Sequence, residues 1–265
     1  MPLTRTFLYS FNNVTIGKDG LEMEYLGLGN YQFMLFKDPF FVQNIADSIR
    51  RLVQDSPVII FYSLFFAILL NRRFRGRTLV RILFFLPVVL TSGVVFEILG
   101  TEIFYNSNNS SIDGPSFMQG QALRTLLYES RLPANLVAAL ITFVDRIFSL
   151  TWRSGVQIIL FLAGLQSIPP MYYEAAHVEG ASGWATFLKI TLPMMSPITF
   201  MVLIYTIIDN FTDYSNRVLR GIFSTAINQL QYGLSSAQAS LYFMVVIVFI
   251  LAANLMFRRG IQEGI

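Results

Sequence analysis

Long apolar stretches separated by short polar segments are the dominant pattern along this chain of 265 residues. A helix that crosses about 30 Å of hydrocarbon needs roughly 20 mostly apolar residues. Five stretches meet this criterion: residues 45–70, 79–104, 141–165, 193–213 and 237–257. The last is the clearest, because it contains the run YFMVVIVFILAANLMF. The pattern therefore predicts an all-α integral membrane protein, a polytopic helix bundle with five spans in this chain.

The composition supports a membrane environment. Hydrophobic residues make up 54% of the chain and charged residues 13%, with a mean hydropathy of +0.55, whereas soluble domains contain about 25% charged residues. In a soluble protein the net charge of +3 would favour nucleic-acid binding. Here the arginines cluster between apolar stretches, as topology signals do, so we expect no nucleic-acid partner. The apolar composition makes membrane lipid an expected partner. The chain has no cysteine and one histidine, so we expect no metal site.

Basic residues predict how the spans are oriented. Cytoplasmic loops carry an excess of Lys and Arg, which places both basic clusters of this chain in the cytoplasm. The first cluster lies between the first two spans and the second follows the last span: Arg72, Arg73, Arg75, Arg77 and Arg81, then Arg258 and Arg259. Alternation then puts the loop 166–192 and the tail 261–265 inside, and the loops 105–135 and 214–236 outside.

The segment 1–44 is the part that this topology explains least. An odd number of spans with a cytoplasmic C-terminus leaves the segment outside the membrane. Either the first two spans insert as a hairpin and carry a short tail across, or a sixth, N-terminal span precedes this chain. We favour the second explanation, so the expected organisation is an extracytoplasmic segment 1–44, a transmembrane core 45–260 and the tail 261–265.

The loop between the third and fourth spans predicts two short helices joined by a glycine turn. Pro169 and Pro170 can begin a helix, and Glu174 lies near its positive N-terminal end. Gly180 stands where a glycine stops a helix in the left-handed conformation. A second helix over residues 182–191 then leads to Pro193 and back into the membrane.

This loop resembles the EAA loop of permease subunits in binding-protein-dependent ABC importers. The match consists of Glu174, Ala175, Ala176, Gly180, Ile190, Leu192 and Pro193 at the family's spacing. The runs LNRRFRGRTLVRILFFLP and WRSGVQIILFLAGLQSIP resemble the carbohydrate branch of that family. A well-capped helix at the membrane surface, without a partner, is the alternative for the loop.

The resemblance implies a permease in the bacterial cell membrane that forms half of the path for a sugar or oligosaccharide. Its implied partners are ATPase subunits that dock on the loop, a second and different permease, and an extracytoplasmic solute-binding protein. The chain has no phosphate-binding motif GxxxxGK[ST], so we expect no catalytic residue and no cofactor here, with ATP and Mg bound by the ATPase. Import of an amino acid, peptide or phosphonate is the alternative function; an intramembrane enzyme or a passive channel are remoter ones.

Polar and aromatic residues inside the spans are candidates for the substrate path. Charged residues within a span are costly and are functional candidates by default, which singles out Glu97 and Asp209, with Asn210 beside the latter. Aromatic faces can stack on sugar rings, which adds Trp152, Tyr205 and Tyr242. The alternatives are a bond to a neighbouring helix for the polar groups and an interfacial or lipid-facing position for the aromatic ones. His177 lies at a variable position of the loop and is interpreted as a surface residue.

Overall fold

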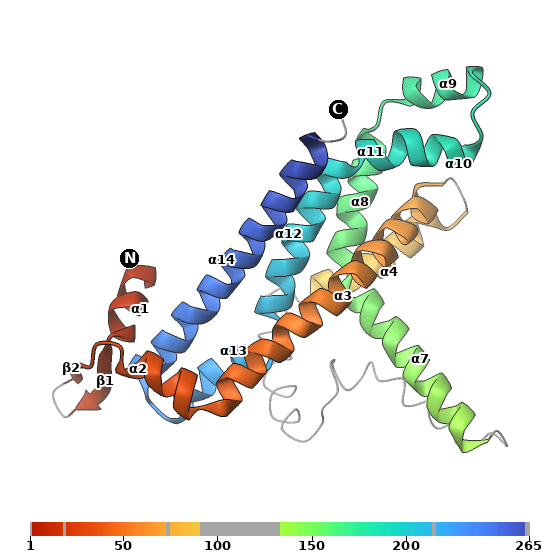
Figure 1. The fold of residues 1–265 in the computed structure, drawn as a ribbon. Helices are drawn as coiled ribbons and strands as arrows, with labels where there is room; N and C mark the ends of the chain where they lie inside the picture. Colours follow the sequence, from red (N-terminus) through yellow and green to blue (C-terminus); the bar gives the residue numbers. More distant parts are fainter. Residues whose placement is uncertain (1, 18–19, 73–74, 91–132, 214–215, 263–265) are drawn as a thin grey trace. The chain divides into compact units, whose positions relative to one another are not determined.

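The computed structural model describes residues 2–17, 20–72, 75–90, 133–213 and 216–262 (Figure 1). They form two compact units: residues 1–57 with 203–265 are the first unit, and residues 58–202 are the second. Two helices, α3 (Pro39–Asn71) and α12 (Ser196–Thr212), contribute residues to both units. Almost all of the described chain is helical, as the apolar pattern predicts.

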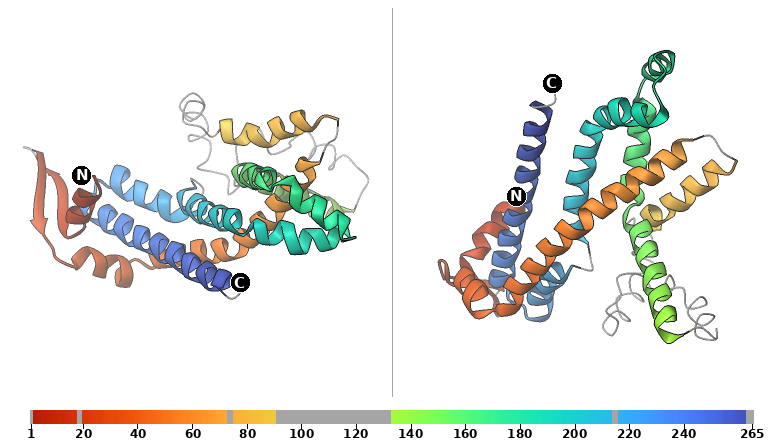
Figure 2. Two further views of the ribbon diagram at one scale, coloured as in Figure 1. Left: turned by 90° about the horizontal axis from the view of Figure 1, so that it is seen from above. Right: turned by 45° about the vertical axis from the view of Figure 1, so that its right-hand side comes forward.

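The first unit is organised around the long helix α14 (Tyr232–Gln262). Helix α1 (Pro2–Ser10) lies beside α14, and strands β1 (Asn12–Gly17) and β2 (Gly20–Tyr25) follow it (Figures 1 and 2). The backbone of β1 touches the start of α14, where a Cβ on Gly233 would lie 2.1 Å from the carbonyl oxygen of Asn12. Glycine is therefore required there for a close approach.

The β-hairpin corrects the prediction of an all-α fold. Its strands pair antiparallel, with Asn12 opposite Tyr25. Asn30, which is buried in the short helix α2 (Gly29–Gln32), donates from Nδ2 to the carbonyl oxygens of Ser10 and Asn12, both at 3.0 Å. The segments NNVTIG and GLEMEY alternate polar and apolar side chains, which is the signal of a strand and was overlooked beside the apolar spans.

The core of the first unit lies between α14 and the other elements of this unit. Along the chain, η1 (Phe33–Lys37) connects α2 to α3, and α13 (Arg217–Phe223) and η5 (Ser224–Asn228) connect α12 to α14. Buried apolar side chains in this core include Met34, Phe41, Leu52, Phe211 and Tyr242. The rings of Phe211 and Tyr242 meet edge to face with centroids 5.4 Å apart, a favourable arrangement for aromatic pairs.

The second unit packs helices around α8 (Gly155–Ser167). The helices beside it are the later part of α3, α4 (Arg77–Leu90) and α7 (Ala134–Arg153). Four short helices follow α8 in the chain: α9 (Pro170–Val178), α10 (Gly183–Thr186), η4 (Phe187–Thr191) and α11 (Leu192–Met194). Phe161, Leu162 and Leu165 of α8 are buried in the core. A Cβ on Gly164 would lie 2.8 Å from Ile198, so α8 and α12 approach each other closely.

The helices agree with most of the predicted spans. By length and composition α3, Asn135–Arg153 and Tyr232–Phe257 can each cross a membrane, and two bent helix pairs raise the number to as many as five. The bent pairs are α8 with α9, at 62°, and Gly183–Met194 with α12, at 61°. Helix α4 covers the start of the predicted span 79–104, and the remainder from residue 91, including Glu97, lies outside the described residues.

The predicted span 141–165 is corrected by a break at Ser154. Helix α7 ends at Arg153 and α8 begins at Gly155, with Ser154 at φ −99° and ψ 5°. The Ser154 hydroxyl donates to the carbonyl oxygen of Leu150, one turn earlier. Serine back-bonding and Ser-Gly pairs both bend helices. The apolar pattern runs through this break, which is why it does not reveal it.

The surface of α14 is apolar, and the described residues of the first unit leave it largely uncovered. Its most apolar window has a mean hydropathy of 2.4, and only 11% of that window is buried. Val248 and Leu255 are 62% and 61% exposed. A helix with this surface needs an apolar environment, either lipid or another membrane subunit.

Candidate functional site

The segment 166–192, here called the coupling loop, begins with a short helix that two prolines define. Pro169 is extended (φ −61°, ψ 135°) and is the N-cap of α9, and Pro170 occupies its first helical position. Proline is suited to this position because its fixed φ matches the helix and it lacks an amide that would need a partner. The prediction for the start of this helix is confirmed.

Gly180 ends α9 in the predicted left-handed conformation, with φ +73°. Its amide donates to the carbonyl oxygen of His177 at 3.1 Å, and the amide of Ala181 donates to that of Ala176 at 2.9 Å. These two hydrogen bonds constitute a Schellman motif. Among the described residues, no atom outside its chain neighbours lies within 4 Å of a Cβ at Gly180, so the requirement for glycine comes from the backbone conformation and not from crowding.

The second helical segment of the loop begins at a conventional cap. The Ser182 side chain accepts a hydrogen bond from the amide of Ala185 at 3.2 Å, as an N-cap serine does. The segment continues through α10, η4 and α11 to Met194. The predicted helix 182–191 is therefore confirmed and extends past Pro193, which lies in α11 as a tolerated early residue.

The two faces of α9 are different. Ala176 is 5% exposed and faces the protein, whereas Glu174 and Ala175 are exposed. Glu174 lies in the second turn of α9 and not in the first. The helix dipole acts mainly within the first turn, so the expected stabilisation of this helix by Glu174 is wrong. Since the carboxylate is not needed to cap its own helix, it is available to a partner.

Large apolar side chains are exposed around this outward face. Met171, Val178 and Trp184 are 65%, 87% and 68% exposed. Tight clusters of exposed apolar residues rimmed by polar ones are typical of protein contact sites. Of the other matching positions, Ile190 is half-buried and Leu192 and Pro193 are exposed.

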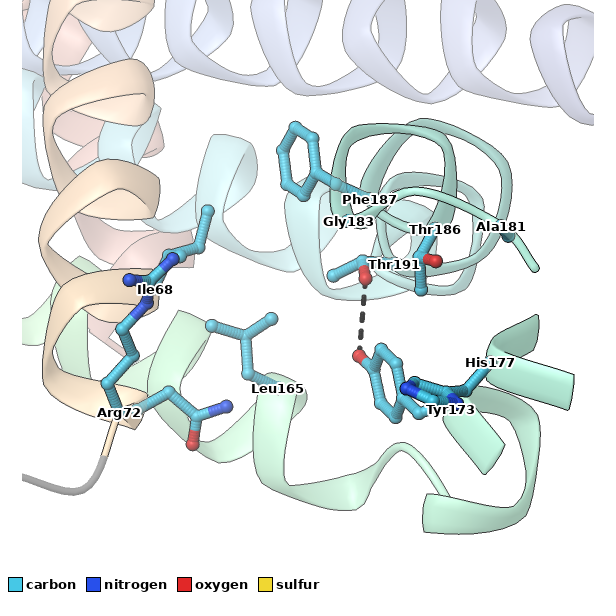
Figure 3. A pocket seen from close by; sticks show the side chains of 11 residues that line it. Ile68, Arg72, Leu165, Tyr173, His177, Ala181, Gly183, Thr186, Phe187 and Thr191 are labelled. Atoms are coloured by element: carbon cyan, nitrogen blue, oxygen red, sulfur yellow. Dashed lines mark hydrogen bonds between the residues drawn. The ribbon is translucent and has the colours of Figure 1, made fainter. Parts of the chain in front are cut away.

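Tyr173 connects α9 to the helical segment that returns to the membrane. Its hydroxyl lies 3.2 Å from Oγ1 of Thr191 in η4, and Thr191 is buried (Figure 3). The Tyr173 side chain also packs against the core of the second unit. The sequence analysis missed this residue; the signal was its position three before Ala176, which places both on one helix face.

A pocket of about 450 Å³ opens beside this connection. Its walls come from the end of α3, from α9 and from the segment 181–191, and Arg72 and His177 line it together with Tyr173 and Thr191 (Figure 3). All of these residues belong to the second unit. The interpretation of His177 as a surface residue is confirmed by its exposure, and it also lines this pocket.

The substrate-path candidates lie in both units. Trp152 is on α7 in the second unit, while Tyr205, Asp209 and Asn210 on α12 and Tyr242 on α14 belong to the first. The Tyr242 hydroxyl is buried and donates to the carbonyl oxygen of Phe211 at 2.9 Å. Its hydroxyl therefore has a structural bond, and its side chain is buried in the core of the first unit and does not face lipid.

A polar cluster in the first unit surrounds Asn216. Oδ1 of Asn216 accepts from the amide of Val218, capping α13, and from the Ser48 hydroxyl at 3.1 Å. Its Nδ2 donates to the carbonyl oxygen of Asn210 at 3.2 Å. Buried polar groups are costly unless they are hydrogen-bonded, and Asn216 satisfies its own groups while connecting α3, α12 and α13.

The long apolar helices define a multi-pass membrane protein, and comparisons with known proteins identify its class. A family model described as a binding-protein-dependent transport system inner membrane component matches residues 39–260. The chain is 30% identical over 241 residues to the probable ABC transporter permease protein YesP of Bacillus subtilis, covering 85% of this chain and 74% of YesP. It is 29% identical over 262 residues to the multiple sugar-binding transport system permease protein MsmF of Streptococcus mutans, covering 92% and 84%.

The fold also resembles a solved transporter. A chain in the crystal structure of a bacterial ABC transporter that imports the acidic polysaccharide alginate superposes with a TM-score of 0.57 at 20% identity, over 89% of this chain and 84% of that one. This chain therefore belongs to the family of binding-protein-dependent transport system inner membrane components. It is the permease subunit of an ABC importer, the ATPase being a separate subunit, and subunits of this family bind no cofactor themselves.

Proposed function

We propose that this permease forms half of the translocation path for a sugar or oligosaccharide and couples it to ATP hydrolysis through the coupling loop. The similarity to MsmF, a multiple sugar-binding transport system permease protein, supports a carbohydrate substrate. The runs that flank the loop resemble the same branch of the family. Import of another solute by the same kind of transporter is the alternative.

The observation that carries the coupling role is the contrast between the two faces of α9. Ala176 and Tyr173 attach the helix to the second unit, and Glu174 and Ala175 point outward beside exposed Met171 and Val178. A partner protein that binds this face can move α9 as a unit, because the Schellman turn at Gly180 fixes the C-terminal end of the helix. Reversing a two-state equilibrium from 1:99 to 99:1 takes about 5.5 kcal/mol of differential interaction, so the element that transmits it has to be firmly held.

The proposed topology follows from the basic clusters. The end of α3 and the C-terminal end of α14 lie in the cytoplasm with the coupling loop, and the β-hairpin and α13 lie outside. Five spans are present in this arrangement, and the segment 1–44 is extracytoplasmic. The core 45–260 carries the transport path, and residues 261–265 are a cytoplasmic tail.

The partners follow from this arrangement. ATPase subunits that hold ATP and Mg dock on the coupling loop, a second and different permease completes the path, and an extracytoplasmic binding protein delivers the solute. Within the path, we assign substrate contacts to Glu97, Trp152, Tyr205, Asp209 and Asn210. We assign Tyr242 to the same path as a residue that supports it from the core of the first unit, because its side chain is buried and its hydroxyl is engaged with Phe211.

A tagged pull-down from native membranes tests the coupling role. The wild-type chain should retain an ATPase and a second permease in mild detergent, and Glu174→Lys should lose the ATPase while keeping the permease. Glu24→Lys in β2 is the matched control, since Glu24 is an exposed carboxylate on the proposed outer side. Retention of the ATPase by Glu174→Lys at the wild-type level would contradict the proposal.

A further inference from the structure

The apolar side chains exposed in the coupling loop lie on two different helical segments. Val178 belongs to α9, whereas Trp184 begins a line of apolar side chains on residues 183–194, here called the return segment. Leu188 and Leu192 continue this line and are 43% and 44% exposed. The three residues follow one another at steps of four, so they lie along one side of the segment.

The π-helical turn in the middle of the return segment keeps this line straight. In η4 the backbone hydrogen bonds reach five residues along the chain instead of four. Residues four apart therefore lie closer to one line than in an α-helix, where a step of four residues turns by about 40°. The rings of Trp184 and Phe187 lie beside each other with centroids 5.7 Å apart, which adds aromatic surface at the start of the line. We call this line, Trp184 with Leu188 and Leu192, the apolar ridge.

Another side of the return segment is occupied by the protein itself. Gly183, Phe187 and Thr191 line the pocket beside α9, and the hydroxyl of Thr191 lies 3.2 Å from that of Tyr173 (Figure 3). Each residue of the ridge follows one of these three by a single position, which turns it by about 100° around the helix. The ridge is therefore turned away from the pocket and from Tyr173.

The way the return segment joins the membrane indicates what covers the ridge. The segment meets α12 at 61°, and the two together are apolar enough to form one bent membrane span. The return segment lies nearer to α4 and α8 than α9 does (Figures 1 and 2), so it is the arm of the loop next to the membrane. Met201, one turn into α12, is 54% exposed and continues the apolar surface into the span.

The residue types of the segment match the headgroup layer of a bilayer. Tryptophan is enriched at the membrane–water interface, where its ring is apolar and its N–H reaches polar groups. Lys189 is exposed next to Leu188, and a lysine stem can lie along apolar surface while its ammonium group stays among polar groups. The cytoplasmic leaflet carries anionic lipids that attract such a charge.

We propose that the return segment lies in the headgroup layer of the cytoplasmic leaflet and inserts its apolar ridge into the lipid. The assignment to this leaflet rests on the proposed topology of the coupling loop. The two arms of the loop then have different partners, with α9 facing the ATPase and the return segment held by lipid. The hydrogen bond between Tyr173 and Thr191 connects the docking helix to this lipid anchor.

Fluorescence quenching by brominated lipid tests the proposal. The full chain, with the subunits that stay attached, is reconstituted into vesicles of ordinary phosphatidylcholine or of phosphatidylcholine brominated either near the headgroup or near the chain ends. Bromine quenches an indole only at close contact, and the difference in emission between the wild type and Trp184→Phe isolates Trp184, because all other tryptophans cancel. We expect this difference to lose intensity in brominated lipid, more with the bromine near the headgroup than near the chain ends.

Val178→Trp in the Trp184→Phe background is the matched control, since it places one indole on α9 at a side chain that is also exposed. The emission that it adds should be the same in brominated and ordinary lipid. Leu188→Asp should reduce the quenching of Trp184, because a charge in the middle of the ridge opposes insertion.

Equal emission of Trp184 in brominated and ordinary lipid would overturn the proposal, because protein or water would then cover the ridge. Quenching of Trp184 together with full retention of the ATPase by Glu174→Lys would support the lipid contact and refute the coupling role. The two proposals can thus fail independently.

Discussion

The coupling loop and the polar cluster around Asn216 differ in how far apart their bonding partners lie in the sequence. In the loop, the bonds from Gly180, Ala181 and Ser182 all connect residues within five positions. In the cluster, the bonds of Asn216 to Val218 and Asn210 are also local, but the bond from Ser48 to Asn216 spans 168 residues. The loop is specified by local backbone rules, whereas the cluster exists only once distant helices have packed.

The largest expected effect is the loss of transport in Gly180→Val. A non-glycine residue in the left-handed region costs about 1–3 kcal/mol, and a β-branched one is among the worst. The Schellman turn should open and α9 should lose its defined direction, so uptake of the solute by whole cells should fall to background. Membrane levels of the chain should remain normal, as an immunoblot of the membrane fraction would verify.

Gly183→Ala is the control for that prediction. Gly183 begins α10 with ordinary backbone angles and has open space around a Cβ, so uptake should stay near the wild-type level. If Gly180→Val and Gly183→Ala transport equally well, the local turn is not what makes the loop competent.

Asn216→Ala should have the next largest effect, this time on stability. The substitution removes an N-cap, worth about 0.5–2 kcal/mol, and leaves the buried Ser48 hydroxyl and Asn210 carbonyl without this partner, at about 1 kcal/mol or more. We expect the free energy of unfolding in detergent to fall by about 2–4 kcal/mol. Asn216→Asp, which keeps the cap acceptor, should lose less; equal losses for both would show that the cluster contributes little beyond α13.

Gly233→Ala probes the close contact between α14 and the β-hairpin. An added Cβ would lie 2.1 Å from the carbonyl oxygen of Asn12, and overpacking of this kind costs about 1–3 kcal/mol. Thermal denaturation should register the loss. Gly221→Ala in α13 has open space around its Cβ and should be neutral or slightly stabilising, by up to about 1 kcal/mol, so the two variants should move in opposite directions.

The smallest effect is expected for Tyr173→Phe. It removes one hydroxyl bond, to Thr191, and keeps the ring in the core, at a cost of about 0.5–1.5 kcal/mol. We expect the chain to fold normally but to transport less solute per ATP hydrolysed, which reconstituted vesicles would measure. If Tyr173→Phe transports as much solute per ATP hydrolysed as the wild type, the Tyr173–Thr191 bond contributes to stability and not to coupling.

These differences show which features could be predicted from the sequence. The start of α9 at Pro170 and its end at Gly180 follow from residues whose backbone preferences are strong on their own. The break at Ser154 was missed because apolar periodicity continues across it, and the hairpin was missed because its alternation is short beside the long spans.

The contacts of the candidate residues could not be predicted in the same way. The engagement of Tyr242 with Phe211, and the hydrogen bond between Ser48 and Asn216, depend on which helices become neighbours. Composition and spacing do not contain that information. Within the coupling loop, the face that Tyr173 shares with Ala176 could have been inferred from helical spacing alone.

Site-directed cross-linking tests the central claim most directly, because the chain has no cysteine of its own. Ala175→Cys places one thiol on the exposed face of α9, and Glu24→Cys places one on the exposed surface of β2. With a short cross-linker that is thiol-reactive at one end and photoreactive at the other, used in native membranes, the account predicts that Ala175→Cys joins the chain to its ATPase and that Glu24→Cys does not. An ATPase adduct from Glu24→Cys, or none from Ala175→Cys while transport remains intact, would contradict it.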